Sequence, residues 1–355
     1  MYINAENCGF IYYDGVLEIG EKKNSMECFY KLGRYLSEKF YKVYIGMPKC
    51  ANISLLYSLA GGLSERGCEI FVCESTDPAS FRFSIPVIAP ECAIYIDRRD
   101  RLQFHNKSGI PCNEIMLISN DSSGTKLKKN ASIHHVCTFE DIYISNLINV
   151  TSLYGRKLKC TISCGNHDIK KLWEEFFEDD DGEDVIQVSE NGTKANIYTL
   201  SYGCITHERL ILAYIALYCR NGKTVFLPDS FHYSAELIEN VNIIRYNNSD
   251  VLPDYASNQR FIKDPLYLCI RLMKDRSAFN KILPSLPKAY SLKRQLSTDI
   301  PFTPDKAVFE YPHGRILTSS AKGSLMELVI QSESAETSAE ICEDFISRIR
   351  NIVDF

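Results

Sequence analysis

The chain has 355 residues, 45% of them hydrophobic and 24% charged, and 40 basic against 45 acidic side chains give a formal net charge of −5. This length is enough for roughly two to four domains with buried cores, and the mild negative charge predicts neither a nucleic-acid partner nor attraction to a membrane surface. No apolar run approaches the roughly 20 residues that span a bilayer. Residues 1–7 also lack the basic and apolar segments of a signal peptide, so we expect a cytoplasmic protein.

The chain contains 14 cysteines, which raises the question of metal or disulfide chemistry. No C-x-x-C occurs, and the closest pairs, Cys68 with Cys73 and Cys160 with Cys164, have no histidine spaced as in a zinc site. This spacing favours small buried side chains in a reducing cell over metal or redox sites.

Strand and helix patterns alternate along the first third of the chain, after a helix expected over about 25–39. Residues 41–46, 69–73 and 92–96 are short β-rich runs, and residues 52–66 carry apolar side chains at helical spacing. A second helical stretch precedes the third run. The order β-α-β-α-β predicts a mostly parallel sheet.

The same alternation restarts after a helical linker expected over about 139–153. A strand at 158–163 and a helix at 168–177, which holds the only tryptophan, form the second cycle. The third cycle consists of a helix, a strand, a short helix, a strand and a helix, at 207–219, 223–227, 235–239, 242–246 and 266–274.

Four prolines between residues 284 and 304 then predict a linker. Beyond it, strands at 315–318 and 326–330 and a helix at 338–349 indicate a small α+β unit. The residues by themselves therefore predict three β/α units followed by an α+β tail.

Several scaffold segments of this chain resemble the first domain of the α-D-phosphohexomutases, such as phosphomannomutase, phosphoglucomutase and phosphoglucosamine mutase. They are residues 44–46, 61–67, 71–73 and 76–78. The order of units agrees over nearly the whole chain. The resemblance implies an α/β protein with three consecutive β/α domains, containing mixed sheets, and a small α+β C-terminal domain. The expected boundaries are 1–155 for domain I, 156–220 for a shortened domain II, 221–302 for domain III and 303–355 for domain IV.

Members of this family isomerise sugar phosphates with a phosphorylated serine in a Thr-Ala-Ser-His-Asn-Pro loop, and the resemblance places that loop after the strand 93–96. Here it reads Asp97-Arg98-Arg99-Asp100-Arg101, which aligns Arg99 with the nucleophile and Asp100 with the histidine. A guanidinium has no nucleophilic oxygen that could carry a phosphoryl group. We therefore expect no catalytic residue at the usual position.

The family's metal loop, Asp-Gly-Asp-Gly-Asp-Arg, aligns with Ser189-Glu190-Asn191-Gly192-Thr193-Lys194. The three ligand positions are then occupied by Ser189, Asn191 and Thr193, which have no carboxylate, and Glu190 is the one acid nearby. Because Mg²⁺ prefers anionic oxygens, we expect neither a bound metal nor another cofactor.

Two further family loops are altered. Residues 247–260 contain no Gly-Glu-x-Ser-Gly-His sugar motif, and residues 318–324 replace the phosphate loop Arg-x-Ser-Gly-Thr-Glu-Pro. There, Ser320 is kept and Lys322 could receive an anion. An ordinary turn between two strands is the alternative interpretation of that segment.

Together these changes predict a phosphohexomutase-like protein that has lost mutase catalysis, because phosphoryl transfer depends on a metal and positioned cations. It would act by binding, as a sugar phosphate sensor, a regulator or an assembly protein. The candidate ligand-binding side chains are Arg98, Arg99, Arg101, Ser320 and Lys322.

The alternative is an active sugar phosphate mutase, or a related enzyme, with an altered site and a need for Mg²⁺. The arginines would then hold a phosphate, with Asp97 or Asp100 as acid or base. A third interpretation is that residues 97–101 form a solvated basic turn that binds no ligand. A fourth is that the chain is an interaction module, which forms a homo-oligomer or binds a protein partner, because its 21 tyrosines suit interfaces.

Overall fold

The structure is a computed structural model of the whole chain. It describes residues 9–13, 16–20, 24–109, 130–179, 184–229, 231–246, 259–297, 308–320 and 325–353. The chain forms two compact units, residues 1–207 with 248–271, and residues 208–247 with 272–355. Among the described residues, no helix combines the length and the apolar character needed to cross a membrane.

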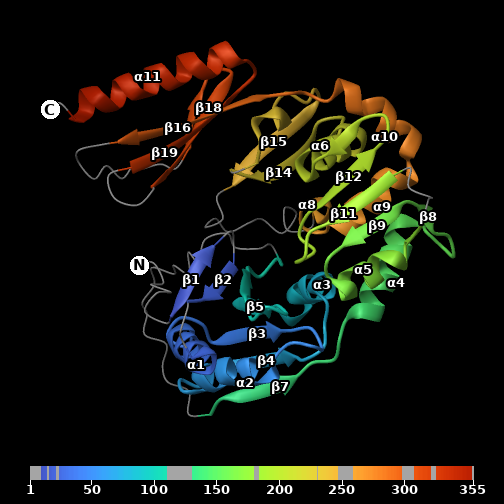
Figure 1. Cartoon of the computed structure of the whole chain (residues 1–355), viewed down its shortest axis with the longest axis vertical. Coiled ribbons are helices and arrows are strands. Elements are labelled where there is room, and N and C mark those ends of the chain that lie inside the picture. The colour runs from blue at the N-terminus through green and yellow to red at the C-terminus, as the bar shows by residue number, and fades with distance from the viewer. Residues whose placement is uncertain are drawn as a thin grey trace. The chain divides into compact units, whose positions relative to one another are not determined.

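A mixed seven-stranded sheet forms the centre of the N-terminal part of the first unit (Figure 1). Strands β5, β3, β4 and β7 run parallel to one another, whereas β1, β2 and β6 join antiparallel beside β5. The expected parallel core over residues 41–96 is therefore confirmed, and the sheet as a whole is mixed. In sheet order its strands are β1 Phe10–Tyr13, β2 Val16–Ile19, β6 Leu102–His105, β5 Cys92–Ile96, β3 Lys42–Gly46, β4 Glu69–Cys73 and β7 Ser132–His135.

Helices cover both faces of this sheet because successive side chains of its buried strands alternate in direction. Helices α1 Ser25–Leu36 and α2 Ile53–Ser64 share a core with Val43 and Ile45 of β3. Helix α3, Pro78–Ile88, packs against the opposite face, where the rings of Tyr44 and Phe81 stack at 4.6 Å. Each helix begins where an Asn or Asp side chain accepts hydrogen bonds from first-turn amides.

A second, four-stranded sheet completes the first unit, in the order β13-β12-β11-β9. The expected strand at 158–163 is interrupted at Cys160, whose amide bonds to the carbonyl of Glu178, so its two halves join different sheets. The strands and helices here are α4 Glu140–Thr151, β8 Leu158–Lys159, β9 Thr161–Cys164, α5 His167–Glu174, β10 Phe177–Glu178, β11 Asp184–Val188, β12 Ala195–Thr199 and β13 Gly203–Ile205. Strand β8 pairs parallel with β10.

Helices and a parallel strand pair, β14 with β15, form the next part of the chain. The helix expected at 235–239 is instead one short 3-10 turn, at Tyr233–Ala235. Helix α8 and the start of α9 belong to the first unit, and the remaining elements belong to the second. In chain order the elements are α6 His207–Tyr218, β14 Lys223–Pro228, η2 Tyr233–Ala235, β15 Val241–Tyr246, α8 Arg260–Lys263, α9 Pro265–Lys274, α10 Arg276–Ile282 and η3 Leu283–Ser285.

The C-terminal part of the second unit is an antiparallel sheet, β16-β19-β18-β17, with one long helix, α11, packed on it (Figure 1). Leu328 and Ile330 of the sheet share a core with Phe345 of the helix. The proline-containing stretch was expected to be a linker, which is wrong for Tyr290–Ser297, because these residues pair with β19 along their whole length. The elements are β16 Tyr290–Ser297, β17 Val308–Tyr311, β18 Gly314–Ser320, β19 Leu325–Ser332 and α11 Ala335–Val353. The four-domain division stays a prediction.

Candidate functional site

The turn from Asp97 to Arg101 joins β5 to β6 and is organised by one carboxylate. Asp97 Oδ1 accepts hydrogen bonds from the amides of Arg99 at 2.8 Å and Arg101 at 2.9 Å, and Asp97 Oδ2 lies 2.6 Å from Arg101 Nε. Asp100 adopts a φ of 60°, which closes the turn. Burial, followed by the charge of Asp97, raises the pKa of the Asp100 carboxyl. Asp97 therefore holds the turn together.

Each of the three arginines in this turn has an acidic partner. Arg98 donates to Asp168 in the first turn of α5. Arg99 Nη2 lies 2.7 Å from Glu190 Oε1. Arg101, which pairs with Asp97, also has Nη1 3.6 Å from Glu18 Oε1. The basic turn is therefore neutralised by acids from three other segments of the same unit.

The turn between β11 and β12 contains the residues aligned with the metal ligands, and these hydrogen-bond to one another. Asn191 Oδ1 accepts from Ser189 Oγ at 2.9 Å and from Thr193 Oγ1 at 2.8 Å. The amide of Thr193 donates to Ser189 Oγ at 3.1 Å. The side chains of Ser189, Asn191 and Thr193 thus stabilise a compact turn.

A buried cation also contacts this turn. Arg82 of α3, 5% exposed, donates from Nη2 to the carbonyl oxygen of Gly192 at 2.8 Å. Burial lowers the pKa of Arg82. The sequence carries a signal for this residue, a single arginine between Phe81 and Phe83 in an otherwise uncharged helix.

The residues present do not fit a magnesium ion. The turn offers neutral side chains and one carboxylate, Glu190, which is paired with Arg99, and Arg82 adds a positive charge beside it. A hard divalent cation binds where several anionic oxygens converge. Within the described ranges, no group of three or more His, Cys, Asp or Glu side chains could hold a metal.

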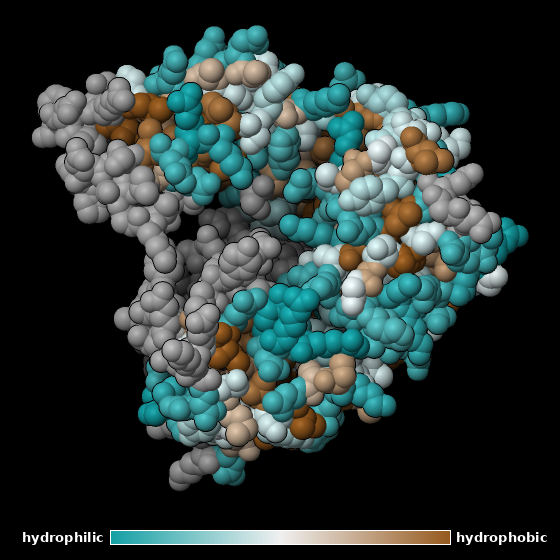
Figure 2. All heavy atoms as spheres, in the orientation of Figure 1, coloured by the Kyte–Doolittle hydropathy of each residue, from teal (hydrophilic) through white to brown (hydrophobic). Residues whose placement is uncertain are grey.

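The two turns and the start of α5 enclose a hollow of about 80 Å³. Ligand pockets for whole small molecules are commonly about 300–1,000 Å³, so this hollow accommodates at most one small anionic group. In Figure 2 the surface near the end of β5 is strongly hydrophilic. The residues around the hollow are Asp97, Arg98, Arg99, Arg101, Gly165, Asn166 and Glu190.

The structure brings together two of the three predicted groups of site residues. Arg98, Arg99 and Arg101 lie in one turn, and the 189–194 turn meets it through Glu190. Of the third group, Ser320 is the last residue of β18 in the second unit, and Lys322 lies outside the described residues. Of the stretch expected to hold the sugar motif, 247–260, residues 247–258 also lie outside them.

The chain has the α-D-phosphohexomutase fold, so the expected fold class is confirmed. A phosphoglucomutase/phosphomannomutase family protein from Burkholderia thailandensis matches with a TM-score of 0.64 and 14% identity, over 96% of this chain and 98% of that one. A Thermus thermophilus protein named as a phosphomannomutase matches with a TM-score of 0.54 and 10% identity, over 96% and 99%.

A looser match is the N-acetylphosphoglucosamine mutase of Aspergillus fumigatus in complex with GlcNAc-6P and magnesium, with a TM-score of 0.43 and 11% identity, over 93% and 96% of the two chains. No protein-family model matches the sequence. No curated protein matches it either. At these identities the likeness establishes the fold.

Proposed function

We propose that this chain is a phosphohexomutase-like protein that has lost mutase catalysis and acts by binding a sugar phosphate. The observation that carries the proposal is the ion pair between Arg99 and Glu190. It joins the position aligned with the phosphorylated serine to the loop aligned with the metal ligands. An ion pair thus occupies the place where the resemblance expects a nucleophile and a cation.

This pair is incompatible with the family reaction. An arginine side chain offers no oxygen to accept and return a phosphoryl group. The transition state of phosphoryl transfer also needs cations placed against its oxygens, usually with a metal. Here the guanidinium charge of Arg99 is balanced by Glu190, and the three former ligand positions bond to one another.

The turn can still bind a phosphate group, because the side chains of Arg99 and Glu190 are both accessible to solvent. The side chains of Arg99 and Glu190 are 64% and 47% exposed. Exposed ion pairs contribute about 0–1 kcal/mol, so a phosphate dianion can replace the Glu190 carboxylate at little cost. Arginine binds phosphate oxygens through two parallel hydrogen bonds.

The first test is a mutase assay on the purified full chain. We expect no interconversion of the 1- and 6-phosphates of glucose, mannose or glucosamine when Mg²⁺ and a bisphosphate activator are present. A catalytically active relative assayed in parallel controls for the conditions. Turnover by this chain would overturn the proposal and support an active mutase with an altered site.

The second test is calorimetric titration with glucose 1-phosphate. Glu190→Gln removes the competing carboxylate, so we expect about three- to tenfold tighter binding, equivalent to roughly 0.7–1.4 kcal/mol. Arg99→Ala should weaken binding about tenfold or more. The matched control is Arg66→Ala, which removes another solvent-accessible arginine, paired with Glu38; the two residues lie just after the ends of α2 and α1.

Absence of binding by wild type and Glu190→Gln alike would exclude the sugar phosphate role. The protein would then be an assembly or regulatory protein that acts through a second copy or a protein partner, and its mass in solution would be the next measurement.

A further inference from the structure

A larger pocket lies between α3 and α8 in the first unit, lined by residues other than those of the hollow. Its volume is about 270 Å³. One wall is apolar and comes from α3, and the facing residues at α8 are charged. The lining residues are Ala79, Arg82, Phe83, Pro86 and Val87 on the α3 side and Arg260, Lys263 and Asp264 on the α8 side.

Positive charge exceeds negative charge in this pocket, because three basic side chains share one carboxylate. Asp264 is already engaged: Oδ2 lies 2.7 Å from Arg260 Nε, and Oδ1 accepts from Tyr143 Oη at 2.9 Å. Over the described residues, the hydrogen bonds of Arg82 go to backbone carbonyl oxygens of the β11–β12 turn. Its charge is thus not balanced by a bonded acid.

Aromatic rings and Asn146 hold Arg260 in place. The centre of its guanidinium lies 5.3 Å from the ring centroid of Tyr143 and 5.2 Å from that of Tyr267. Nη1 donates to Asn146, and Nη2 has no hydrogen-bond partner in the described part of the chain. A guanidinium fixed in this way loses little entropy when an anion arrives nearby.

Lys263 supplies the third cation. Its Nζ donates to the carbonyl oxygen of Ser108 at 2.9 Å. Burial lowers the pKa of Lys263 to about 8, Asp264 raises it and Arg260 lowers it. The ammonium is therefore mainly protonated at neutral pH.

We propose that this pocket binds a small organic oxyanion, a molecule with an apolar body and one carboxylate or phosphate group. The apolar body would lie against Phe83, Pro86 and Val87, and the anionic group would face the cations of α8. Charge attraction is strong there because the apolar wall lowers the local dielectric. The preference for an apolar body separates this site from the hydrophilic hollow at Arg99.

The test uses benzoate and phenyl phosphate as the two oxyanion probes, titrated into the full chain by calorimetry. We expect at least one of them to bind saturably, and at least tenfold more tightly than benzyl alcohol, which lacks the charge, and inorganic phosphate, which lacks the apolar body. The stronger of the two probes identifies the anionic group. Equal binding of benzyl alcohol, or no saturable binding of either probe, would overturn the proposal.

Two variants that place opposite charges at the rim of the pocket test where the probes bind. Val87 is 65% exposed, so Val87→Glu should fold normally and weaken probe binding at least tenfold, whereas Val87→Lys should not weaken it. Ile53→Glu, at an exposed position of α2, is the control and should leave binding unchanged. Binding that is insensitive to Val87→Glu would contradict the assigned location. Arg99→Ala should not affect the probes, so failure of this proposal is distinguishable from failure of the sugar phosphate role.

Discussion

Gly62→Ala is expected to lower the free energy of unfolding of the first unit by about 3 kcal/mol, whereas Gly61→Ala, one residue earlier, should leave it unchanged or raise it by up to about 1 kcal/mol. The difference arises because α1 and α2 touch through their backbones at Gly62. A Cβ there would lie 2.6 Å from the amide nitrogen of Arg34 and closer still to the carbonyl oxygen of Tyr30. Backbone atoms cannot move aside without separating the helices.

The neighbouring position has room for the same methyl group. A Cβ on Gly61 would lie 3.8 Å from the ring of Tyr30, an ordinary van der Waals contact. Alanine favours the helix over glycine by up to about 1 kcal/mol, which explains the opposite sign.

Urea unfolding followed by tryptophan fluorescence measures this prediction, because Trp173 is the single tryptophan of the chain and is buried in the first unit. Circular dichroism on the same samples reports loss of helix. Equal stability of the two alanine variants would show that α1 and α2 are not in backbone contact.

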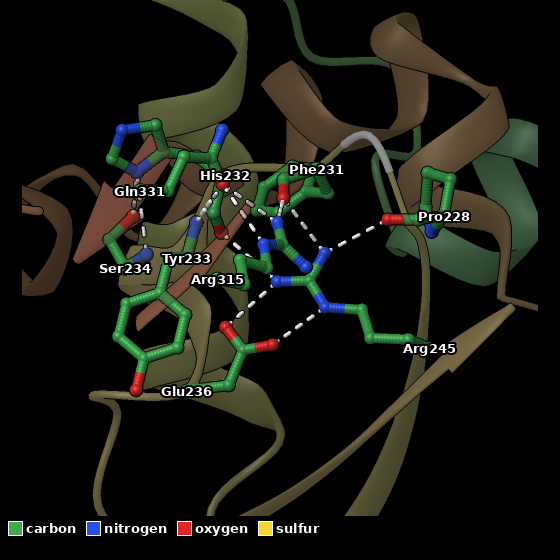
Figure 3. A network of polar contacts seen from close by, with 9 residues as sticks. All are labelled: Pro228, Phe231, His232, Tyr233, Ser234, Glu236, Arg245, Arg315 and Gln331. Carbon is green, nitrogen blue, oxygen red and sulfur yellow. Dashed lines mark hydrogen bonds and ion pairs between the residues drawn. The ribbon is translucent and has the colours of Figure 1, made fainter. Parts of the chain in front are cut away.

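Arg245→Met is expected to destabilise the second unit by about 2 kcal/mol, and Arg315→Met by about 1 kcal/mol or less. Both arginines belong to one polar network beside η2 (Figure 3). Arg245 forms a two-pronged ion pair with Glu236, at 2.6 Å and 2.8 Å. It also donates to the carbonyl oxygens of Pro228, Phe231 and His232. Its loss leaves the Glu236 carboxylate, 27% exposed, without its bonded cation, whereas the carbonyls of Pro228 and His232 keep the amides of Phe231 and Ala235 as donors.

Arg315 is fully buried, but its acceptors keep other donors (Figure 3). Gln331 Oε1 accepts from Arg315 Nε at 3.1 Å and also from the amide of Tyr233 at 3.0 Å. The carbonyl of Phe231 accepts from Arg315 and from Arg245. Burial, then the nearby Arg245 charge, lowers the pKa of Arg315 to about 10, so methionine removes an unfavourable buried charge along with its hydrogen bonds.

Hydrogen exchange of the backbone amides in β14, β15, β18 and β19 measures the stability of the second unit in both variants, because these strands lie in that unit. Protection should fall strongly in Arg245→Met and little in Arg315→Met. The reverse order would mean that burial of charge, and not the loss of bonded partners, governs stability there.

Much of the fold could be predicted from local pattern. The bounds of α1, α2, β3, β4 and β5 agree with the expected elements within a few residues, because apolar spacing and capping residues act within a few positions along the chain. β16 was missed because nearby prolines suggested a linker, and its strand character depends on pairing with β19, which follows it later in the chain.

The candidate site, like the fold, was predictable only where local sequence decides it. The sequence placed Arg99 after β5 and showed that Ser189, Asn191 and Thr193 carry no carboxylate. It could not show that Glu190 meets Arg99 across 91 residues, or that Arg82 reaches the carbonyl of Gly192 across 110. Such contacts depend on how two sheets pack, which no local pattern encodes.

By itself, the sequence of this protein predicted many of its strands and helices and the resemblance to the phosphohexomutases, in which Arg99 aligns with the nucleophile. Only the tertiary structure decided which contacts these residues make, an ion pair between Arg99 and Glu190 and a turn around Asn191 whose side chains hydrogen-bond to one another. The physical reason is that residue types limit the chemistry of a side chain, whereas charge balance depends on which side chains become neighbours when the chain folds.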